Sequence, residues 1–200
     1  MNSPFTSCLL IMKKNIIILL LSLINLDLIN SQFIIETARL KIRPFNNQDS
    51  HFLYPLLSDP EVMAHSRDGA LDIQGTKKYL TERIIKPFVL QGFGRYALFR
   101  KDNENFIGFC GLTIHKLDDE KEYIELGYKI KKNFWNQGYA SESALVIKEY
   151  ARDVLGLKDL ISIIEPSNYA SIRVAEKVGL KFWKKSFFNN EIVNVYRIIF

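Results

Sequence analysis

The sequence has few of the residues that mark disulfide-rich or metal-binding proteins. It contains two cysteines and three histidines among 200 residues. Cys8 and Cys110 lie far apart, and neither belongs to a Cys-x-x-Cys pair or to a His-rich cluster. This spacing supports neither a disulfide framework nor a zinc site, so we expect no metal and a reducing compartment.

The common nucleotide-binding motifs are also missing. The chain has no Gly-Lys-Ser/Thr phosphate loop and no G-x-G-x-x-G fingerprint, and after residue 33 it shows no repeat, low-complexity stretch or linker. Its hydrophobic content of 48% is enough for one full core, which predicts a single domain over residues 33–200. A net charge of +5 favours an anionic partner, such as a nucleic acid, a membrane surface or a phosphate-bearing ligand.

Residues 1–32 differ from the rest of the chain. Lys13 and Lys14 precede an apolar run from Ile16 to Leu26, which is shorter than the ~20 residues of a membrane span and resembles the core of a signal peptide. No Ala-x-Ala-like cleavage site follows. Three interpretations stay open: an uncleaved membrane anchor, an export signal, or an extension from a misassigned start codon, which we favour.

The stretch from Tyr123 to Ser143 organises the remaining sequence. Apolar residues alternate up to Ile130, which predicts a strand, and a polar run then leads into a helix that begins near Ala140. The first turn of a helix offers unpaired backbone N–H groups and a favourable dipole to an anion. Gly138 and the small residues at 140 and 141 let an anion approach, so we expect a phosphate-binding loop here.

The flanking segments predict a mixed α/β fold. Asn46, Asn47 and Asp49 supply turn and helix-cap chemistry before a helix that ends at Asp59-Pro60. A second helix, with Ile73 on its inner face, is expected to bend or end at Pro87. The expected strands are 39–45, 95–100, 106–117, 123–130, 159–165, 180–189 and 191–200, and the expected helices are 52–57, 71–90, 140–156 and 169–178. Short polar connectors predict an antiparallel meander, and the strand, helix, strand order after residue 123 predicts a parallel pair.

Three blocks of sequence resemble the GNAT superfamily of N-acetyltransferases. The loop W-N-Q-G-Y-A is similar to the W-G-x-G-Y-A loop of the RimJ/RimL-like branch, with Asn136 in place of its first Gly. E-T-x-R-L-x-I-R-P near residue 40 and N-x-x-S followed by E-K-x-G near residue 168 resemble the opening and closing blocks of the same branch. The resemblance implies a mostly antiparallel twisted sheet of six to seven strands with about four flanking helices and a parallel strand pair around the coenzyme A site.

The resemblance also implies a cofactor, a reaction and site residues. The co-substrate would be acetyl-CoA, the acceptor a primary amine such as a ribosomal or other protein N-terminus, and the location cytoplasmic, with a tether to the inner membrane face as the alternative. The protein would be a monomer or a homodimer. Cofactor contacts are expected at Ile130, Trp135, Asn136, Gln137, Gly138, Tyr139, Ala140, Ser141 and Asn168. Asn168 could equally be a simple helix cap.

The chemistry of acetyl transfer can be argued from the residues. A lysine-type amine has a pKa near ~10.4, so transfer at neutral pH needs a base. Glu125 is the best-placed carboxylate, although pairing with a cross-strand cation is the alternative interpretation. Ser171 matches the position that the family places near the sulfur, where it could protonate the thiolate; ordinary first-turn chemistry is the alternative. Cys110 has no partner His nearby, so direct transfer in a ternary complex is expected.

Smaller roles are assigned to other polar residues. Tyr169 and Tyr139 are weak candidates for a phenolic acid. The lysines at 129, 131 and 132 could attract the nucleotide phosphates or could form a solvated strand end. Two further functional classes stay open: a non-catalytic acyl-CoA sensor of the same fold and a basic nucleic-acid-binding module.

Overall fold

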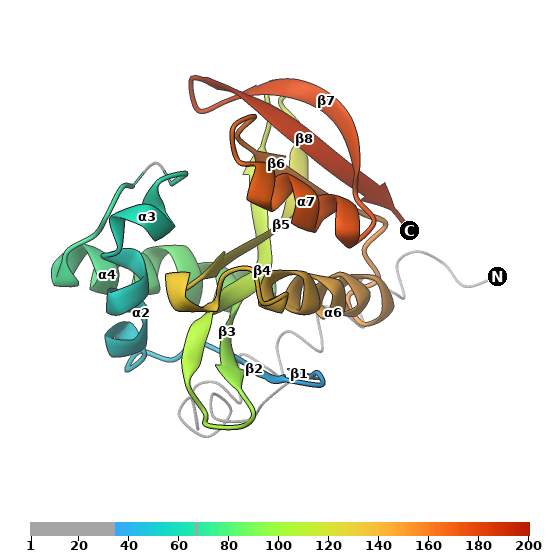
Figure 1. Ribbon diagram of the computed structural model, residues 1–200. Coiled ribbons are helices and arrows are strands. Elements are labelled where there is room, and N and C mark those ends of the chain that lie inside the picture. Colours follow the sequence, from blue (N-terminus) through green and yellow to red (C-terminus); the bar gives the residue numbers. More distant parts are fainter. Residues whose placement is uncertain (1–34, 67) are drawn as a thin grey trace.

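One sheet of eight strands runs through the molecule (Figure 1). The structure is a computed structural model, and it describes residues 35–66 and 68–200. The expectations for residues 1–32 therefore lie outside the described residues. In the order β1-β2-β3-β4-β5-β6-β8-β7, every neighbouring pair is antiparallel except β5 and β6. The strands are β1 (Ile35–Glu36), β2 (Leu40–Pro44), β3 (Arg95–Arg100), β4 (Phe106–Lys116), β5 (Glu122–Ile130), β6 (Asp159–Ile164), β7 (Lys181–Phe188) and β8 (Glu191–Ile199).

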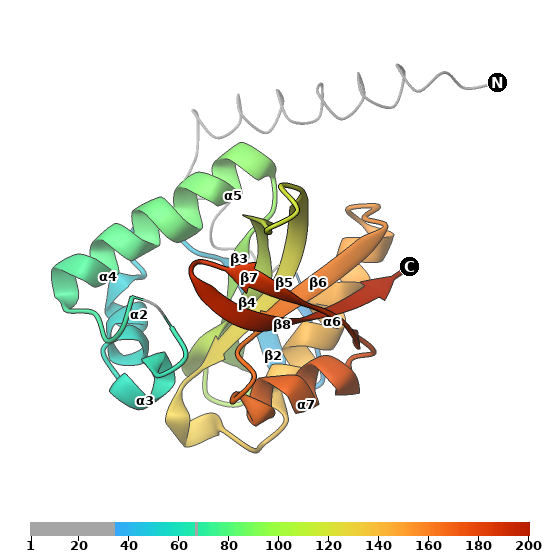
Figure 2. The same ribbon diagram turned by 90° about the horizontal axis from the view of Figure 1, so that it is seen from above.

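Helices cover both faces of this sheet (Figure 2). On one face lie α2 (Ser50–Leu57), α3 (Pro60–Met63) and a long rod made of α4 (Ile73–Tyr79), the π-helical turn η1 (Leu80–Ile85) and α5 (Lys86–Gln91). The other face carries α6 (Tyr139–Asp153) and α7 (Tyr169–Lys177). A 3-10 turn, η2 (Lys132–Phe134), follows β5.

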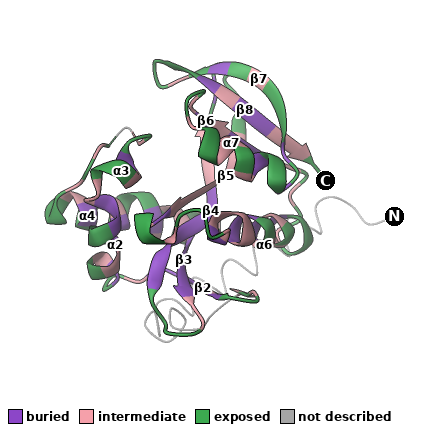
Figure 3. Ribbon diagram, viewed as in Figure 1, coloured by how far each residue is buried: buried purple, intermediate pink, exposed green. Residues whose placement is uncertain are grey.

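Each face has its own apolar core, because the side chains of a strand alternate between the two faces (Figure 3). Leu126 and Ile130 of β5 pack against Ile147 of α6 on one face. Phe109 of β4 packs with the residues of α2 and η1 on the other face. The middle of the sheet is therefore shielded on both sides, and it holds the strands β4 and β5 in fixed positions.

The predicted meander and terminal hairpin are confirmed. β3, β4 and β5 follow one another as antiparallel neighbours, and β7 and β8 pair across a turn at Asn189 and Asn190. These two residues have φ values of 58° and 69°, as a type I′ hairpin turn requires. The sheet has one strand more than the largest expected number, since the two-residue β1 precedes β2.

The segment before β3 departs from the expectations in three places. The Asp49 carboxylate makes no side-chain cap on α2, because it binds Arg43 and the Asn46 amide instead. Ile73 is 40% exposed, since it lies in the first turn of α4, and Leu71 packs against the core in its place. Of the two expected effects of Pro87, ending the helix is wrong: α5 continues past it to Gln91, and the π-helical turn lies just before it.

Candidate active site

The parallel strands β5 and β6 separate soon after they meet. They share one bridge, between Glu125 and Ile161. Beyond this bridge, side chains donate hydrogen bonds to two backbone carbonyl groups of β5 that face β6. The Ser162 hydroxyl donates to Leu126 O at 2.7 Å, and the Trp135 indole donates to Ile130 O at 2.7 Å. Because alternate residues of a strand direct their amide groups to the same side, the backbone N–H and C=O of Tyr128 face the gap between the strands.

The loop after β5 turns sharply before α6 begins. Asn136 has a φ of 58° and Gly138 a φ of 82°, both in the left-handed region that glycine and asparagine tolerate best. Asn136 therefore keeps the geometry expected of a glycine at this position. The Glu142 amide donates to Gly138 O at 3.0 Å, so the amides of residues 139 to 141 precede the first bond of the helix.

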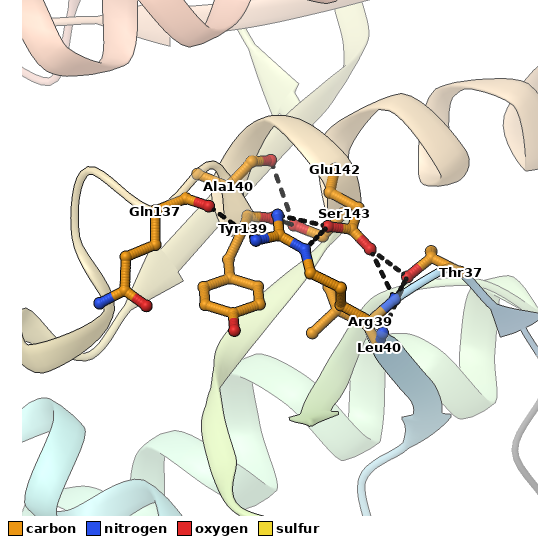
Figure 4. A network of polar contacts seen from close by, with 8 residues as sticks. All are labelled: Thr37, Arg39, Leu40, Gln137, Tyr139, Ala140, Glu142 and Ser143. Carbon is orange, nitrogen blue, oxygen red and sulfur yellow. Dashed lines mark hydrogen bonds and ion pairs between the residues drawn. The ribbon is translucent and has the colours of Figure 1, made fainter. Parts of the chain in front are cut away.

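A polar clamp holds this loop from behind (Figure 4). The Arg39 guanidinium lies 2.6 Å from a Glu142 carboxylate oxygen and donates to Gln137 O at 2.9 Å. Its carbon lies 4.3 Å from the centre of the Tyr139 ring, and Thr37 donates to the same carboxylate at 2.5 Å. Thr37 and Arg39 belong to the E-T-x-R-L block of the sequence, whose supporting role had not been recognised from the pattern alone.

The loop and the gap open into one cleft of about 1200 Å³. Both expected catalytic residues, Glu125 and Ser171, line it. So do the expected cofactor-binding residues Ile130, Trp135, Asn136, Gly138, Tyr139, Ala140, Ser141 and Asn168. Gln137 does not: its amide donates to Asn133 O at 2.8 Å and its carbonyl binds Arg39.

The start of α7 forms one wall of the cleft. Asn168 caps the helix, accepting a hydrogen bond from the Ser171 amide at 3.0 Å. The Tyr128 hydroxyl lies 3.4 Å from Ser171 O, and burial raises the pKa of this phenol to about 12. Tyr169 is 68% exposed and the ring of Tyr139 is buried under Arg39, whereas the Tyr128 hydroxyl lies beside Ser171. Sequence reasoning missed it because it counted Tyr128 among the apolar face of the strand.

Glu125 has a cross-strand partner, as the alternative interpretation held, but this partner is a histidine of β4 and not a lysine or an arginine. Its Oε2 lies 2.9 Å from His115 Nε2, and its Oε1 accepts from the Ile163 amide at 3.3 Å. Burial would raise the pKa of Glu125, but the His115 hydrogen bond and charge, Arg95 and the Ile163 amide outweigh it and lower the pKa. The carboxylate is therefore ionised at neutral pH, with 18% of its side chain exposed to the cleft.

Of the loop lysines and the Cys110 thiol, one group lies in the cleft and the others lie outside it. Of the three lysines near the loop, Lys129 lines the cleft, whereas Lys131 lies over the Phe106 ring and Lys132 pairs with Glu61 at 2.5 Å. Cys110 is fully buried, and burial raises the pKa of its thiol to about 12, as its assignment to the core requires. Among residues 35–66 and 68–200, no helix is long and apolar enough to cross a bilayer, and no group of three or more His, Cys, Asp or Glu could hold a metal ion.

The parallel pair β5 and β6 parts, and the residues at the start of α6 line the same cleft, an arrangement that suits an extended anionic ligand. A family model described as acetyltransferase (GNAT) domain matches residues 39–181. The chain therefore belongs to the GNAT acetyltransferases and is an acetyltransferase enzyme, and the expected fold class is confirmed.

Known relatives agree with this assignment. The N-acetyltransferase YnaD of Bacillus subtilis (strain 168) is 32% identical over 158 residues, covering 76% of this chain and 86% of YnaD. A crystal structure of a GNAT-family acetyltransferase from Bacillus anthracis has a TM-score of 0.67 at 24% identity, covering 82% of this chain and 97% of that one. RimL, an alpha-N-protein acetyltransferase of a ribosomal protein solved with coenzyme A, has a TM-score of 0.68 at 19% identity, covering 84% and 98%.

Proposed function

We propose that the protein transfers the acetyl group of acetyl-CoA directly to a primary amine, in a ternary complex. The observation that carries this proposal is the convergence of three features on one cleft: the unpaired amides at the start of α6, the open edge of β5 and the ionised Glu125. The acceptor could be a protein N-terminus or a small amine. The W-N-Q-G-Y-A loop favours the RimJ/RimL-like branch, and the use of acetyl-CoA favours the cytoplasm.

The chain supplies groups for both ends of the co-substrate. The amides of residues 139 to 141 would bind the pyrophosphate, and Gly138 gives the loop the backbone conformation that exposes them. The backbone amide of Tyr128 would pair with the extended pantetheine arm as a neighbouring strand would, with Asn168 and Ser171 on the facing wall.

The transfer needs protons to move at both the nitrogen and the sulfur. Glu125, directly or through a water, takes one proton from the ammonium form, and the neutral amine then forms the N–C bond to the acetyl carbon. As the C–S bond breaks, the departing thiolate takes a proton from a nearby hydroxyl, and the second proton lost by the nitrogen restores that hydroxyl through water. Ser171 and Tyr128 both reach this part of the cleft, and the high pKa of the Tyr128 phenol keeps it protonated at neutral pH.

The loop assignment is tested by titrating acetyl-CoA calorimetrically into the full-length protein. An ideal Cβ on Gly138 would lie 3.4 Å from the Arg39 side chain, so the space there is sufficient and the positive φ is the obstacle. A side chain in the left-handed region costs roughly 1–2 kcal/mol, so we expect Gly138→Val to weaken acetyl-CoA binding about tenfold. Gly156→Val is the matched control, because Gly156 also has a positive φ, of 67°, in open space after the far end of α6. Wild-type affinity in Gly138→Val would overturn the assignment of the loop.

Catalysis is tested with Glu125→Gln. We expect turnover to fall about 100-fold, the usual effect of losing a general base, while acetyl-CoA affinity stays the same. Glu165→Gln is the control, since Glu165 also lines the cleft and pairs with a histidine, His65, at 2.6 Å. Unchanged turnover in Glu125→Gln would remove this residue from the mechanism; a folded wild type that binds acetyl-CoA but acetylates no amine would instead favour a sensor.

A further inference from the structure

The acceptor half of the cleft has a floor of three strands. Cross-strand pairing places Arg95 of β3, Gly111 of β4 and Gly127 of β5 in one row. Glu125 and Lys129 lie two positions on either side of Gly127, and side chains two apart on a strand share a face. The floor therefore carries the Glu125 carboxylate at one end and the Lys129 amine at the other, with the Arg95 guanidinium at the side.

Gly127 leaves this floor bare. An ideal Cβ there would meet nothing closer than the Glu125 carboxyl group, at 3.7 Å, and the backbone needs no positive φ. A strand rises about 3.3 Å per residue, so the Cα atoms of Glu125 and Lys129 lie roughly 13 Å apart. A small molecule that lies on Gly127 can therefore reach both side chains at once.

Arg95 is fixed in position by its surroundings. Its guanidinium lies 5.6 Å from the centres of both the Tyr79 and the Phe109 rings. It also donates to Arg83 O at 3.2 Å. Pro87, four residues after Arg83, has no N–H with which to make an α-helical bond to this carbonyl. The Arg95 guanidinium is therefore positioned by two rings and a backbone carbonyl.

Lys129 reaches the same space. Its amine donates to the Ser66 hydroxyl, a neutral partner. Burial lowers the pKa of Lys129 to about 8, with repulsion from Arg95 adding to the effect and Asp68 opposing it. Both observations describe a positive charge that the fold withdraws from water without compensating it.

The carboxylates of this half act on the two cations only from a distance: Arg95 lowers the pKa of Glu125, and Asp68 opposes the lowering of the Lys129 pKa. Among the described residues, no carboxylate lies within ion-pair distance of Arg95 or Lys129. Three lining carboxylates are paired elsewhere: Glu125 with His115, Glu165 with His65 and Glu61 with Lys132. Asp68 and Glu191 also line the cleft and are exposed, and Asp68 acts on Lys129 only at longer range.

We propose that the acceptor is an amine that carries its own anionic group, a carboxylate or its equivalent, within a few bonds of the nitrogen. Arg95 and Lys129 bind the anion, and Glu125 faces the amine across Gly127. This assignment rests on the proposed function. It disfavours polyamines, whose further positive charges would meet Arg95 and Lys129. The anion could belong to a free amino acid or to an acidic peptide N-terminus, which share this chemistry.

The test compares matched amines with and without the anion, using the full-length protein and saturating acetyl-CoA. The probes are alanine and alaninamide, the C-terminally amidated peptides Asp-Ala-Ala and Asn-Ala-Ala, and spermidine. We expect kcat/KM to be at least about tenfold higher for the anionic member of one pair, which also identifies the source of the anion. Arg95→Gln and Lys129→Met should each reduce that ratio several-fold. Arg100→Gln, at the other end of β3, and Lys121→Met, in an exposed turn, are the controls.

Equal turnover of both members of each pair, or a preference for spermidine, would overturn the proposal while leaving acetyl transfer intact. Failure to bind acetyl-CoA would instead contradict the proposed function. If acetyl-CoA binds and no probe turns over, N-acetylalanine and N-acetylalaninamide are titrated into the CoA-saturated protein. Tighter binding of the carboxylate, lost in Arg95→Gln, supports the proposal, and equal binding overturns it.

Discussion

Arg43 of β2 and Lys129 of β5 lie in the same row of the sheet, joined by the cross-strand pairs Arg43–Ala97, Ala97–Phe109 and Phe109–Lys129. Both cations are largely withdrawn from solvent. Arg43 makes two hydrogen bonds to Asp49, at 2.6 and 2.8 Å, and that carboxylate is itself buried. The Lys129 amine has the Ser66 hydroxyl as its partner, and its charged neighbours are Arg95 and, with the opposite effect, Asp68.

The difference separates a cation that supports the fold from one that serves a ligand. At Arg43 the charge is neutralised within the protein, and the pair fixes the turn before α2. At Lys129 the charge is left for something that enters the cleft. A cation that is partly withdrawn from water and has no ion-pair partner lowers stability, and we attribute the lysine at this position to the ligand that it would bind. Variants that remove the counter-ion of Arg43 or the charge of Lys129 test this contrast.

Removing the partner of Arg43 should have the largest effect. We expect Asp49→Asn to lower the free energy of unfolding by about 3–5 kcal/mol, because it leaves a buried guanidinium without its counter-ion. Urea denaturation measures the loss. Asp102→Asn is the control: Asp102 pairs with Arg100 but is 57% exposed, so its removal should cost less than about 1 kcal/mol. If both variants lost the same free energy of unfolding, the distinction between the buried Asp49 pair and the exposed Asp102 pair would be contradicted.

Removing the charge of Lys129 should have the opposite sign. The folded pKa of about 8 lies below the ordinary value of 10.5, so at pH 7 protonation favours the unfolded chain. This gap corresponds to about 3 kcal/mol, and we expect Lys129→Met to be more stable than wild type by up to that amount. Between pH 8 and 10.5 the unfolded chain binds more protons, so the stability of wild type rises with pH and the advantage of the variant shrinks.

Urea denaturation at pH 7 and at pH 10 measures this difference. Lys121→Met, in an exposed turn, should change stability little at either pH. A Lys129→Met protein that is less stable than wild type at pH 7 would mean that Lys129 is compensated in the fold as Arg43 is.

The same contrast shows how far the sequence predicts this molecule. Local signals were sufficient for the strands of the meander, the turn at Asn189 and Asn190 and the loop with Gly138 that joins β5 to α6, because periodicity and turn chemistry act over a few residues. The role of Asp49 was mistaken because a cap and a buried ion pair use the same residue types. Only the folded chain shows that the cation six residues earlier points toward it.

The acceptor side of the site was the least predictable part. Arg95, His115, Glu125 and Lys129 come together through the register of three strands, which the sequence does not specify. His115 is the residue that could have been found: the predicted antiparallel pairing of its strand with the next one already placed it near Glu125. The position of Tyr128 at the gap depends on where β5 and β6 part, and no local pattern marks that point.

Arg39 is a third cation, paired but 46% exposed, and it should give the smallest change in stability. We expect Glu142→Gln to lower the free energy of unfolding by about 1 kcal/mol or less, since water replaces much of the lost interaction. Acetyl-CoA affinity should nevertheless fall several-fold, because Arg39 also orders the loop through Gln137 O. Calorimetry and urea denaturation measure the two effects, with Glu149→Gln, on the same helix, as the control. Unchanged affinity would show that the loop keeps its shape without the clamp. A loss of stability as large as that of Asp49→Asn would show that an exposed arginine–carboxylate pair contributes as much to stability as a buried one.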